Sequence, residues 1–286
     1  MIILKAVKDL TLMKNILYRE LPHSITVLGG VLHILHNNLC HLEMCVDSWP
    51  TFTTAICYRQ KKYLSSSGSS SSVIPDICTV FTKNPETLRS LLLNKRVINW
   101  RNGLIFRGIP SSRCDLIKEL ATLSGLDITE YGGYNTFIHH SLENTDEQEK
   151  VLLLPVSILD ESHAELVDTH LLYGGNQDSL NHVRACIRHL PNHCVMDEKG
   201  RPVSWVLSDE LCELRMAYTL PKYRRAGHLL ALSLSLIRRM SSLGLPVYCH
   251  VSQHNQAVIN ALTSLGFSAC PSMEKISVLL ICKDRV

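Results

Sequence analysis

Two arginines and a glycine stand just before a long apolar helix in the second half of the chain. Arg224, Arg225 and Gly227 lie between a strand-like segment and a helical pattern, with Lys222 close before them. The first N–H groups of a helix have no partner within it and lie at the positive end of the helix dipole, so such a turn can bind phosphate oxygens. By itself this pattern is more often a solvated turn, so the interpretation depends on its surroundings.

A carboxylate and a guanidinium stand two residues apart a little upstream of this turn. Glu213 and Arg215 fall on the same face of the strand that we expect from Glu213 onward, and an exposed ion pair of this kind stabilises a protein very little. A guanidinium can also hold a carboxylate through two parallel hydrogen bonds, as the acid group of an amino acid would require. The residues alone favour a structural ion pair between Glu213 and Arg215.

The first half carries a group of histidines and cysteines that could suggest a metal site, namely His33, His36, Cys40, His41 and Cys45. Their spacing does not match the usual zinc frameworks, and in a strand over this region His33 and His36 would face opposite sides. We interpret them as half-buried or surface polar residues and expect no metal site in the chain.

The elements that must position the arginine turn follow a clear order in the second half. We expect a strand, two helices, three strands, a helix, a strand, a helix and a final strand. Asp178 or Ser179 is expected to cap the second helix. Its apolar stripe is Leu180, Val183, Ile187 and Leu190, and the helix after the arginine turn has a stripe of Leu229, Leu232, Leu236, Met240 and Leu243.

The first half is less regular. Residues 24–36 and 51–60 have the β-branched and apolar content of strands, while residues 115–126 have helical spacing and a glycine stop. Two polar stretches, 65–72 and 141–150, are expected to be loops or linkers. We place the domain boundary in the second of them, between residues 147 and 148.

Composition sets the broad class. A chain of 286 residues with 45% hydrophobic and 19% charged residues is expected to form two globular domains rather than a disordered segment, and the strand and helix patterns above make the fold class α/β (α+β). A net charge of +3 suits local binding of an anion but not general binding of nucleic acid. Eleven cysteines without a CxxC pair or a secretory signal predict reduced thiols, and no apolar run is long enough for a membrane span.

The surroundings of the turn carry a family resemblance. Arg224-x-x-Gly227 resembles the pyrophosphate loop of the GNAT acyltransferase superfamily, and Asn255, eleven residues before Gly266, resembles the motif that follows it. Leu229 stands where a second small residue is usual, and Leu262 where many members have a tyrosine acid. A set of six blocks, at 46–52, 97–100, 173–176, 197–205, 213–227 and 243–251, is similar to the glycine N-acyltransferase and glycine N-acyltransferase-like family.

This resemblance implies a GNAT-type fold in the C-terminal half and an enzyme that moves an acyl group from acyl-CoA to the amino group of glycine or, in some members, glutamine. It implies that Glu213 is the base that deprotonates the amine. Arg215, as the alternative to its ion pair with Glu213, would bind the acceptor's carboxylate through its guanidinium. The resemblance also implies a donor site whose residues are Met216, Ala217, Tyr218, Thr219 and Leu220 for pantetheine, Arg224, Arg225, Ala226, Gly227, His228 and Leu229 for the pyrophosphate, and Asn255 for the cofactor, unless Asn255 only caps a helix.

Several alternatives stay open. Without a tyrosine at Leu262, the thiolate could be protonated by another tyrosine or by water, or it could leave unprotonated. A cysteine nucleophile at Cys249 is conceivable, although direct attack needs fewer assumptions. The chain could also be a CoA-binding or interaction module without turnover, or an acetyltransferase acting on proteins.

We expect acyl-CoA as co-substrate and no tightly bound cofactor. We also expect a monomer without nucleic-acid partners. The resemblance suggests a mitochondrial protein. The cytosol is the alternative, because the basic N-terminal segment also contains Asp9 and Glu20 and is equally well an amphipathic helix that ends at Pro22.

Overall fold

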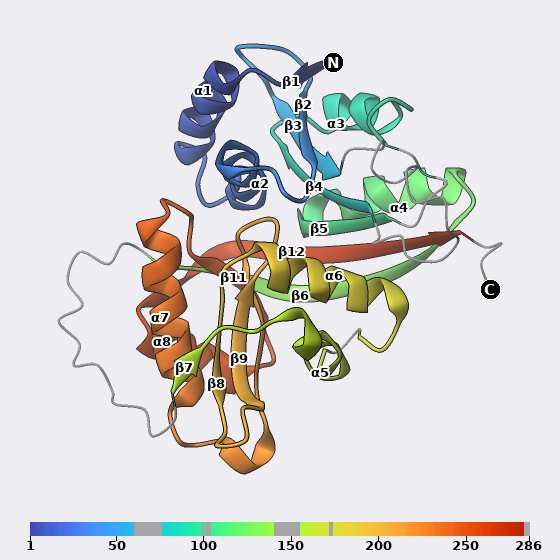
Figure 1. Ribbon diagram of the computed structural model, residues 1–286. Helices are drawn as coiled ribbons and strands as arrows, with labels where there is room; N and C mark the ends of the chain where they lie inside the picture. Colours follow the sequence, from blue (N-terminus) through green and yellow to red (C-terminus); the bar gives the residue numbers. More distant parts are fainter. Residues whose placement is uncertain (60–75, 99, 101–103, 140–154, 172–173, 283–286) are drawn as a thin grey trace. The chain divides into compact units, whose positions relative to one another are not determined.

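The computed structural model describes residues 1–286 except 60–75, 99, 101–103, 140–154, 172–173 and 283–286. The chain divides into two compact units (Figure 1). Unit 1 comprises Met1–Thr136, His250–His254 and Cys270–Val286, and unit 2 comprises Phe137–Cys249 and Asn255–Ala269. Both expected linkers, and the boundary expected between residues 147 and 148, lie outside the described residues.

Unit 1 is built on a mixed sheet. The elements from the first half of the chain are β1 (Ile2–Leu4), α1 (Val7–Tyr18), α2 (Ile25–His36), β2 (Leu42–Val46), β3 (Thr54–Arg59), β4 (Asp76–Thr82), α3 (Pro85–Leu92), β5 (Leu104–Pro110), α4 (Cys114–Leu123) and β6 (Leu126–His139), whose last three residues belong to unit 2. Strands β1 to β4 pair antiparallel in chain order, β4 and β5 pair in parallel, and β12 (Phe267–Cys282) pairs antiparallel with β5.

The expectation of a strand at 24–36 is wrong, because this segment forms α2. Every residue from Ile25 to His33 is buried, and a continuously apolar run has the same appearance in a buried strand and in a buried helix. The histidines are bound locally, since His33 Nε2 accepts a hydrogen bond from the Cys40 N–H at 3.1 Å and His36 Nδ1 lies 3.1 Å from the Leu32 carbonyl oxygen. The strand at 54–59 and the helix at 114–123 are confirmed.

A lysine is buried in unit 1. Lys275 on β12 lies opposite Pro110 of β5 and is 1% exposed, and its Nζ has no hydrogen-bond partner among the described residues. Burial lowers its pKa from about 10.5 to about 8. Between these two values the unfolded chain holds one proton more than the folded chain, so this lysine makes stability rise with pH in that window. Below pH 8 the folded state carries the full cost of the buried charge.

Lys275→Met is therefore expected to raise the free energy of unfolding at pH 7 by about 2 to 3 kcal/mol. The gain over the wild type should shrink as the pH rises from 8 towards 10.5. Urea unfolding of both proteins at pH 7 and pH 10 measures the difference directly. A variant no more stable than the wild type at pH 7 would contradict an uncompensated buried charge.

The second half of the chain, most of which belongs to unit 2, has the order of elements expected from the sequence. After β7 (Val156–Ser157) come a short 3-10 turn (Glu161–His163), α5 (Ala164–Thr169), α6 (Gln177–His189), β8 (Asn192–Met196), β9 (Pro202–Ser208) and β10 (Leu214–Thr219). They are followed by α7 (His228–Ser242), β11 (Tyr248–Ser252), α8 (Gln256–Ser264) and β12. Strands β7, β8, β9 and β10 form an antiparallel sheet in chain order.

Helices cover both faces of this sheet (Figure 1). Cys194, Trp205 and Leu207 pack with α5 and α6, while α7 lies against β8 and β9 from the other side. The expected stripes are confirmed in their centres: Val183 and Ile187 of α6, and Leu232, Leu236 and Met240 of α7, are buried. The cap expected at Asp178 or Ser179 is Asn176 instead, whose side chain accepts a hydrogen bond from the Ser179 N–H.

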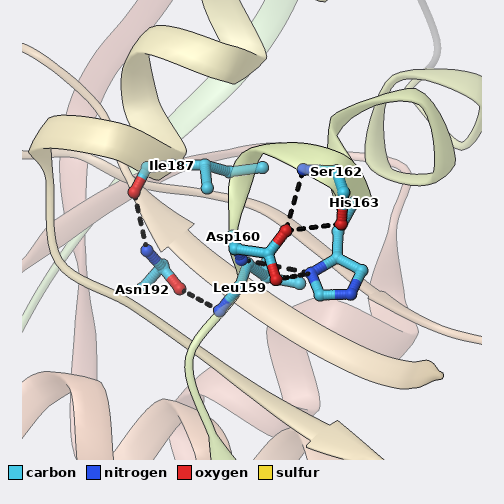
Figure 2. A network of polar contacts seen from close by, with 6 residues as sticks. All are labelled: Leu159, Asp160, Ser162, His163, Ile187 and Asn192. Carbon is cyan, nitrogen blue, oxygen red and sulfur yellow. Dashed lines mark hydrogen bonds and ion pairs between the residues drawn. The ribbon is translucent and has the colours of Figure 1, made fainter. Parts of the chain in front are cut away.

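A polar network fixes the segment that follows β7 (Figure 2). Asn192 Oδ1 accepts a hydrogen bond from the Leu159 N–H at 2.7 Å, and its Nδ2 donates to the Ile187 carbonyl at 3.2 Å. Asp160 caps the 3-10 turn by accepting a hydrogen bond from the Ser162 N–H. These contacts tie the segment after β7 to the end of α6 and the start of β8.

The ten cysteines from Cys40 to Cys270 are reduced and take part in no disulfide. Within the described residues, no helix is both long enough and apolar enough to cross a lipid bilayer.

The two halves of the chain repeat one order of elements. In each half a strand and two helices precede three antiparallel strands, and a helix, a strand, a helix and a strand follow. The strand after the third helix pairs in parallel with the strand before that helix, as β4 pairs with β5 and as Glu213, just before β10, bridges Tyr248 of β11. The turns before α3 and α7 are thus equivalent places in the two halves.

Candidate functional site

The turn before α7 is open for an anion. Arg225 and Gly227 both have a left-handed backbone, with φ of +66° and +80°. Gly227 is the N-cap of α7, no side chain of the described residues caps the helix, and its first turn holds no acidic residue. Arg224, Arg225 and Ala226 are exposed. Free backbone N–H groups at a helix start, with two cations beside them, can bind phosphate oxygens.

The equivalent turn in the first half is closed to such a ligand. Asn84 caps α3 by accepting a hydrogen bond from the Glu86 N–H at 3.0 Å, and Pro85 has no N–H to offer. Glu86 adds a negative charge in the first turn of the helix, which would repel an anion. Of the two equivalent turns, the one before α7 is therefore the candidate anion site.

Arg224 is positioned by the end of β10. Its Nε donates to the Thr219 carbonyl at 3.0 Å and its Nη2 to the Tyr218 hydroxyl at 3.2 Å. The guanidinium carbon lies 5.4 Å from the centre of the Tyr218 ring, within cation–π range. Tyr218 itself packs on Trp205 and His170. This aromatic support, which the sequence did not reveal, fixes the direction of the arginine.

Strand β10 carries a bulge at its centre. Arg215 lies opposite Leu207 and Tyr218 opposite Trp205, so Met216 and Ala217 together face a single residue of β9. Met216 has a φ of +54°, which is costly for a residue other than glycine. A bulge leaves an extra residue outside the hydrogen-bonded ladder, so backbone groups at 216–217 can serve a bound chain.

Glu213 stands where β10 and β11 come together. It bridges Tyr248 in parallel and is 4% exposed. The turn before it is organised by the buried Asp209, whose Oδ1 accepts hydrogen bonds from the N–H groups of Leu211 at 2.9 Å and Glu213 at 3.0 Å. Tyr248 fixes the same turn by donating from its hydroxyl to the Leu211 carbonyl at 2.8 Å.

Arg215 forms an ion pair with Asp209, a partner that the sequence did not indicate. Arg215 Nη1 lies 3.6 Å from Asp209 Oδ2, and that carboxylate is fully buried whereas the arginine side chain is 36% exposed. The turn between β9 and β10 brings Asp209 beside Arg215. The alternation of side chains along a strand cannot predict this contact, because Asp209 lies outside the strand. An aspartate at the start of the turn was the available signal, since aspartate side chains often accept hydrogen bonds from N–H groups just ahead.

Cys249 is poorly suited to be a nucleophile. The residue is 5% exposed, and burial, with the charge of Glu213 as a second cause, raises the pKa of its thiol well above the ordinary range. Because the thiolate is the reactive form, this environment disfavours covalent chemistry at Cys249.

The other residues singled out from the sequence differ in burial and in hydrogen bonding. Asn255 caps α8 by accepting a hydrogen bond from the Val258 N–H at 3.3 Å, which is the capping role considered from the sequence. His228 is 5% exposed, so its ring is buried rather than presented to a ligand. Leu229 and Leu262 are both half-buried. Thr219 Oγ1 lies 2.7 Å from Ser204 Oγ, which anchors the end of β10 to β9.

Comparison with known families decides the identity of the chain. Residues 1–191 match the model of the aralkyl acyl-CoA:amino acid N-acyltransferase family, and residues 193–275 match the model of its C-terminal region. The chain belongs to the aralkyl acyl-CoA:amino acid N-acyltransferase family.

Curated relatives agree over nearly the full length of this N-acyltransferase. Glycine N-acyltransferase-like protein 2 of Homo sapiens is 30% identical over 284 residues, covering 95% of each chain. The glycine N-acyltransferase of Bos taurus is 30% identical over 291 residues, covering 95% of this chain and 97% of the relative.

Solved structures show the fold of the N-acyltransferase. A Drosophila protein matches with a TM-score of 0.73 at 15% identity, covering 97% of both chains. A GCN5-related N-acetyltransferase from Sphaerobacter thermophilus matches with a TM-score of 0.50 at 11% identity, covering 98% of this chain and 94% of that one. The fold is that of the GNAT acyltransferases, in a mixed α/β chain.

Proposed function

We propose that this N-acyltransferase transfers the acyl group of an acyl-CoA to the amino group of glycine or another small amino acid, such as glutamine. The open, basic helix start at Gly227 carries the proposal, because it offers the site that the diphosphate of CoA needs. The bulge at Met216 and Ala217 supports it by freeing backbone groups along the strand that leads to this turn.

Glu213 is proposed as the base. An amino acid attacks a thioester only after its ammonium group loses a proton, and a positioned carboxylate can accept that proton. The amine nitrogen then forms a bond to the carbonyl carbon, the carbon–sulfur bond breaks, and CoA leaves as a thiolate that takes up a proton. Direct attack is favoured over an acyl-cysteine intermediate because burial keeps the Cys249 thiol protonated.

Arg215 is proposed to bind the acceptor's carboxylate. Its side chain is 36% exposed while Asp209 holds it from the buried side, so a guanidinium face remains accessible to an incoming acid group. A neutral or basic amine without a carboxylate would lose this contact. The proposal therefore favours free amino acids over internal lysine side chains.

Product analysis separates this function from its alternatives. The purified protein is incubated with benzoyl-CoA or acetyl-CoA and an equimolar mixture of glycine, glutamine and a lysine-containing peptide, and the products are identified by mass. We expect N-acyl amino acid and free CoA in equal amounts. Acylated peptide alone would favour a protein acetyltransferase. CoA binding without any product would favour a binding module.

For the cell, we propose a mitochondrial location with the cytosol as the alternative, and a monomeric protein. Fractionation and light scattering test the two statements.

A further inference from the structure

Three potential metal ligands converge in unit 2. They are His182 and Cys186, one helical turn apart on α6, and Glu210 in the turn between β9 and β10. The nitrogen, sulfur and oxygen atoms all lie within 4.8 Å of one another. Cys186 is 1% exposed, the Glu210 side chain 2% and the His182 side chain 21%, so the group is largely shielded from water.

The spacing suits a tetrahedral ion. Zinc lies about 2.3 Å from sulfur and about 2.0 Å from nitrogen or oxygen, so tetrahedral angles separate a sulfur and a nitrogen ligand by about 3.5 Å and a nitrogen and an oxygen ligand by about 3.3 Å. The Cys186 Sγ to His182 Nε2 distance is 3.6 Å, and the His182 Nε2 to Glu210 Oε2 distance is 3.7 Å. Small side-chain adjustments would bring all three atoms into ligand range.

We propose that His182, Cys186 and Glu210 form a site for a divalent transition-metal ion, with Zn²⁺ as the best fit. A thiolate, an imidazole and a carboxylate are a ligand set that suits zinc and disfavours magnesium or calcium, which prefer oxygen. The thiol of Cys186 releases one proton to solvent when it binds the ion. Water completes the fourth position.

A bound ion would connect the turn that contains Glu210 to helix α6. Glu210 lies in the turn that Asp209 organises, three residues before Glu213, while His182 and Cys186 belong to α6. An ion bound to all three side chains would restrict the movement of this turn relative to α6. The site would thus act on stability and on the position of Glu213 without touching a reacting atom.

The sequence did not point to this group. His182 and Cys186 have a suitable helical spacing, but the third ligand is distant in the chain and lies in a turn whose path could not be predicted. A histidine and a cysteine four residues apart are too common to indicate a metal on their own.

The test uses the untagged full-length protein, stripped with a chelator and dialysed. Zn²⁺ uptake is measured by elemental analysis, and Co²⁺ is added separately because a thiolate ligand gives cobalt a charge-transfer band in the near ultraviolet. We expect one equivalent of either ion, a thiolate band with Co²⁺, and a rise in melting temperature with Zn²⁺. Cys186→Ser, His182→Gln and Glu210→Gln should each weaken Zn²⁺ binding at least about tenfold.

Two control variants exclude indirect effects. Cys194→Ser removes another buried thiol from the same core, and His189→Gln removes another histidine from α6; both should keep the ion and the cobalt band. Uptake by the wild type no greater than by Cys186→Ser would overturn the site, as would a cobalt spectrum without the thiolate band. If Cys186→Ser fails to fold, the wild-type spectrum and Glu210→Gln decide the question.

Discussion

Replacing Glu213 by glutamine is expected to lower the rate of acyl transfer at neutral pH by at least about tenfold, and up to the 10²- to 10⁴-fold range typical of general bases. Glutamine keeps the shape of the side chain but cannot accept the proton. At high pH the amino acid is already deprotonated in solution, so the variant should recover part of its rate. Affinity for CoA should stay unchanged, because the substitution preserves the side chain's shape and leaves the turn at Gly227 intact.

The comparison needs a matched variant. Glu198→Gln makes the same chemical change at an exposed position in the turn between β8 and β9 and should behave as the wild type. Initial rates of thiol release from benzoyl-CoA with glycine, measured at several pH values, supply the profile. A Glu213→Gln protein with a wild-type rate at neutral pH would remove the carboxylate from the mechanism.

Gly227→Ala is expected to raise the dissociation constant for CoA about tenfold. Gly227 has a φ of +80° and forms the start of α7, so a methyl group there strains the backbone and stands where a phosphate would approach the N–H groups. Gly244 provides the control at the other end of the same helix, with a φ of +68° and no atom within 4 Å of an added Cβ. Calorimetric titration with CoA measures both variants.

The two alanine variants should lose similar amounts of stability but differ in their affinity for CoA. Each forces alanine into a left-handed conformation that costs about 1 to 2 kcal/mol, so both melting temperatures should fall by similar amounts. CoA affinity should fall for Gly227→Ala alone. Equal affinities in the two variants would mean that the diphosphate is held elsewhere.

The second half of the fold could be predicted from the sequence because its elements have separate signals. The helices have apolar stripes of clear period, and glycines and prolines mark most of their ends, so the order of elements was predicted correctly. In the first half, residues 25–36 lack that contrast because Ile25–His33 are buried on every side, and the β-branched residues there suggested a strand. Burial by the rest of the chain overrides local preference in such a segment.

In the candidate site, too, features set by neighbouring residues could be predicted from the sequence, whereas contacts made by folding could not. The turn at Gly227 is local, so its residue types and its place before a helix could be read from the sequence, and the family resemblance then favoured a phosphate site over a solvated turn. The partner of Arg215 is not local: Asp209 reaches it through a turn with a left-handed Cys212, and strand periodicity pointed to Glu213 instead. The group of His182, Cys186 and Glu210 depends on the packing of a helix against that turn and could only be seen in three dimensions.

The rate of thiol release from benzoyl-CoA by the wild-type protein, with and without glycine, tests the central claim most directly. The account predicts release that depends on glycine, saturates with it, and yields one N-acylglycine for each CoA freed. A protein that binds CoA but releases no thiol with glycine, glutamine or any other amino acid would contradict it.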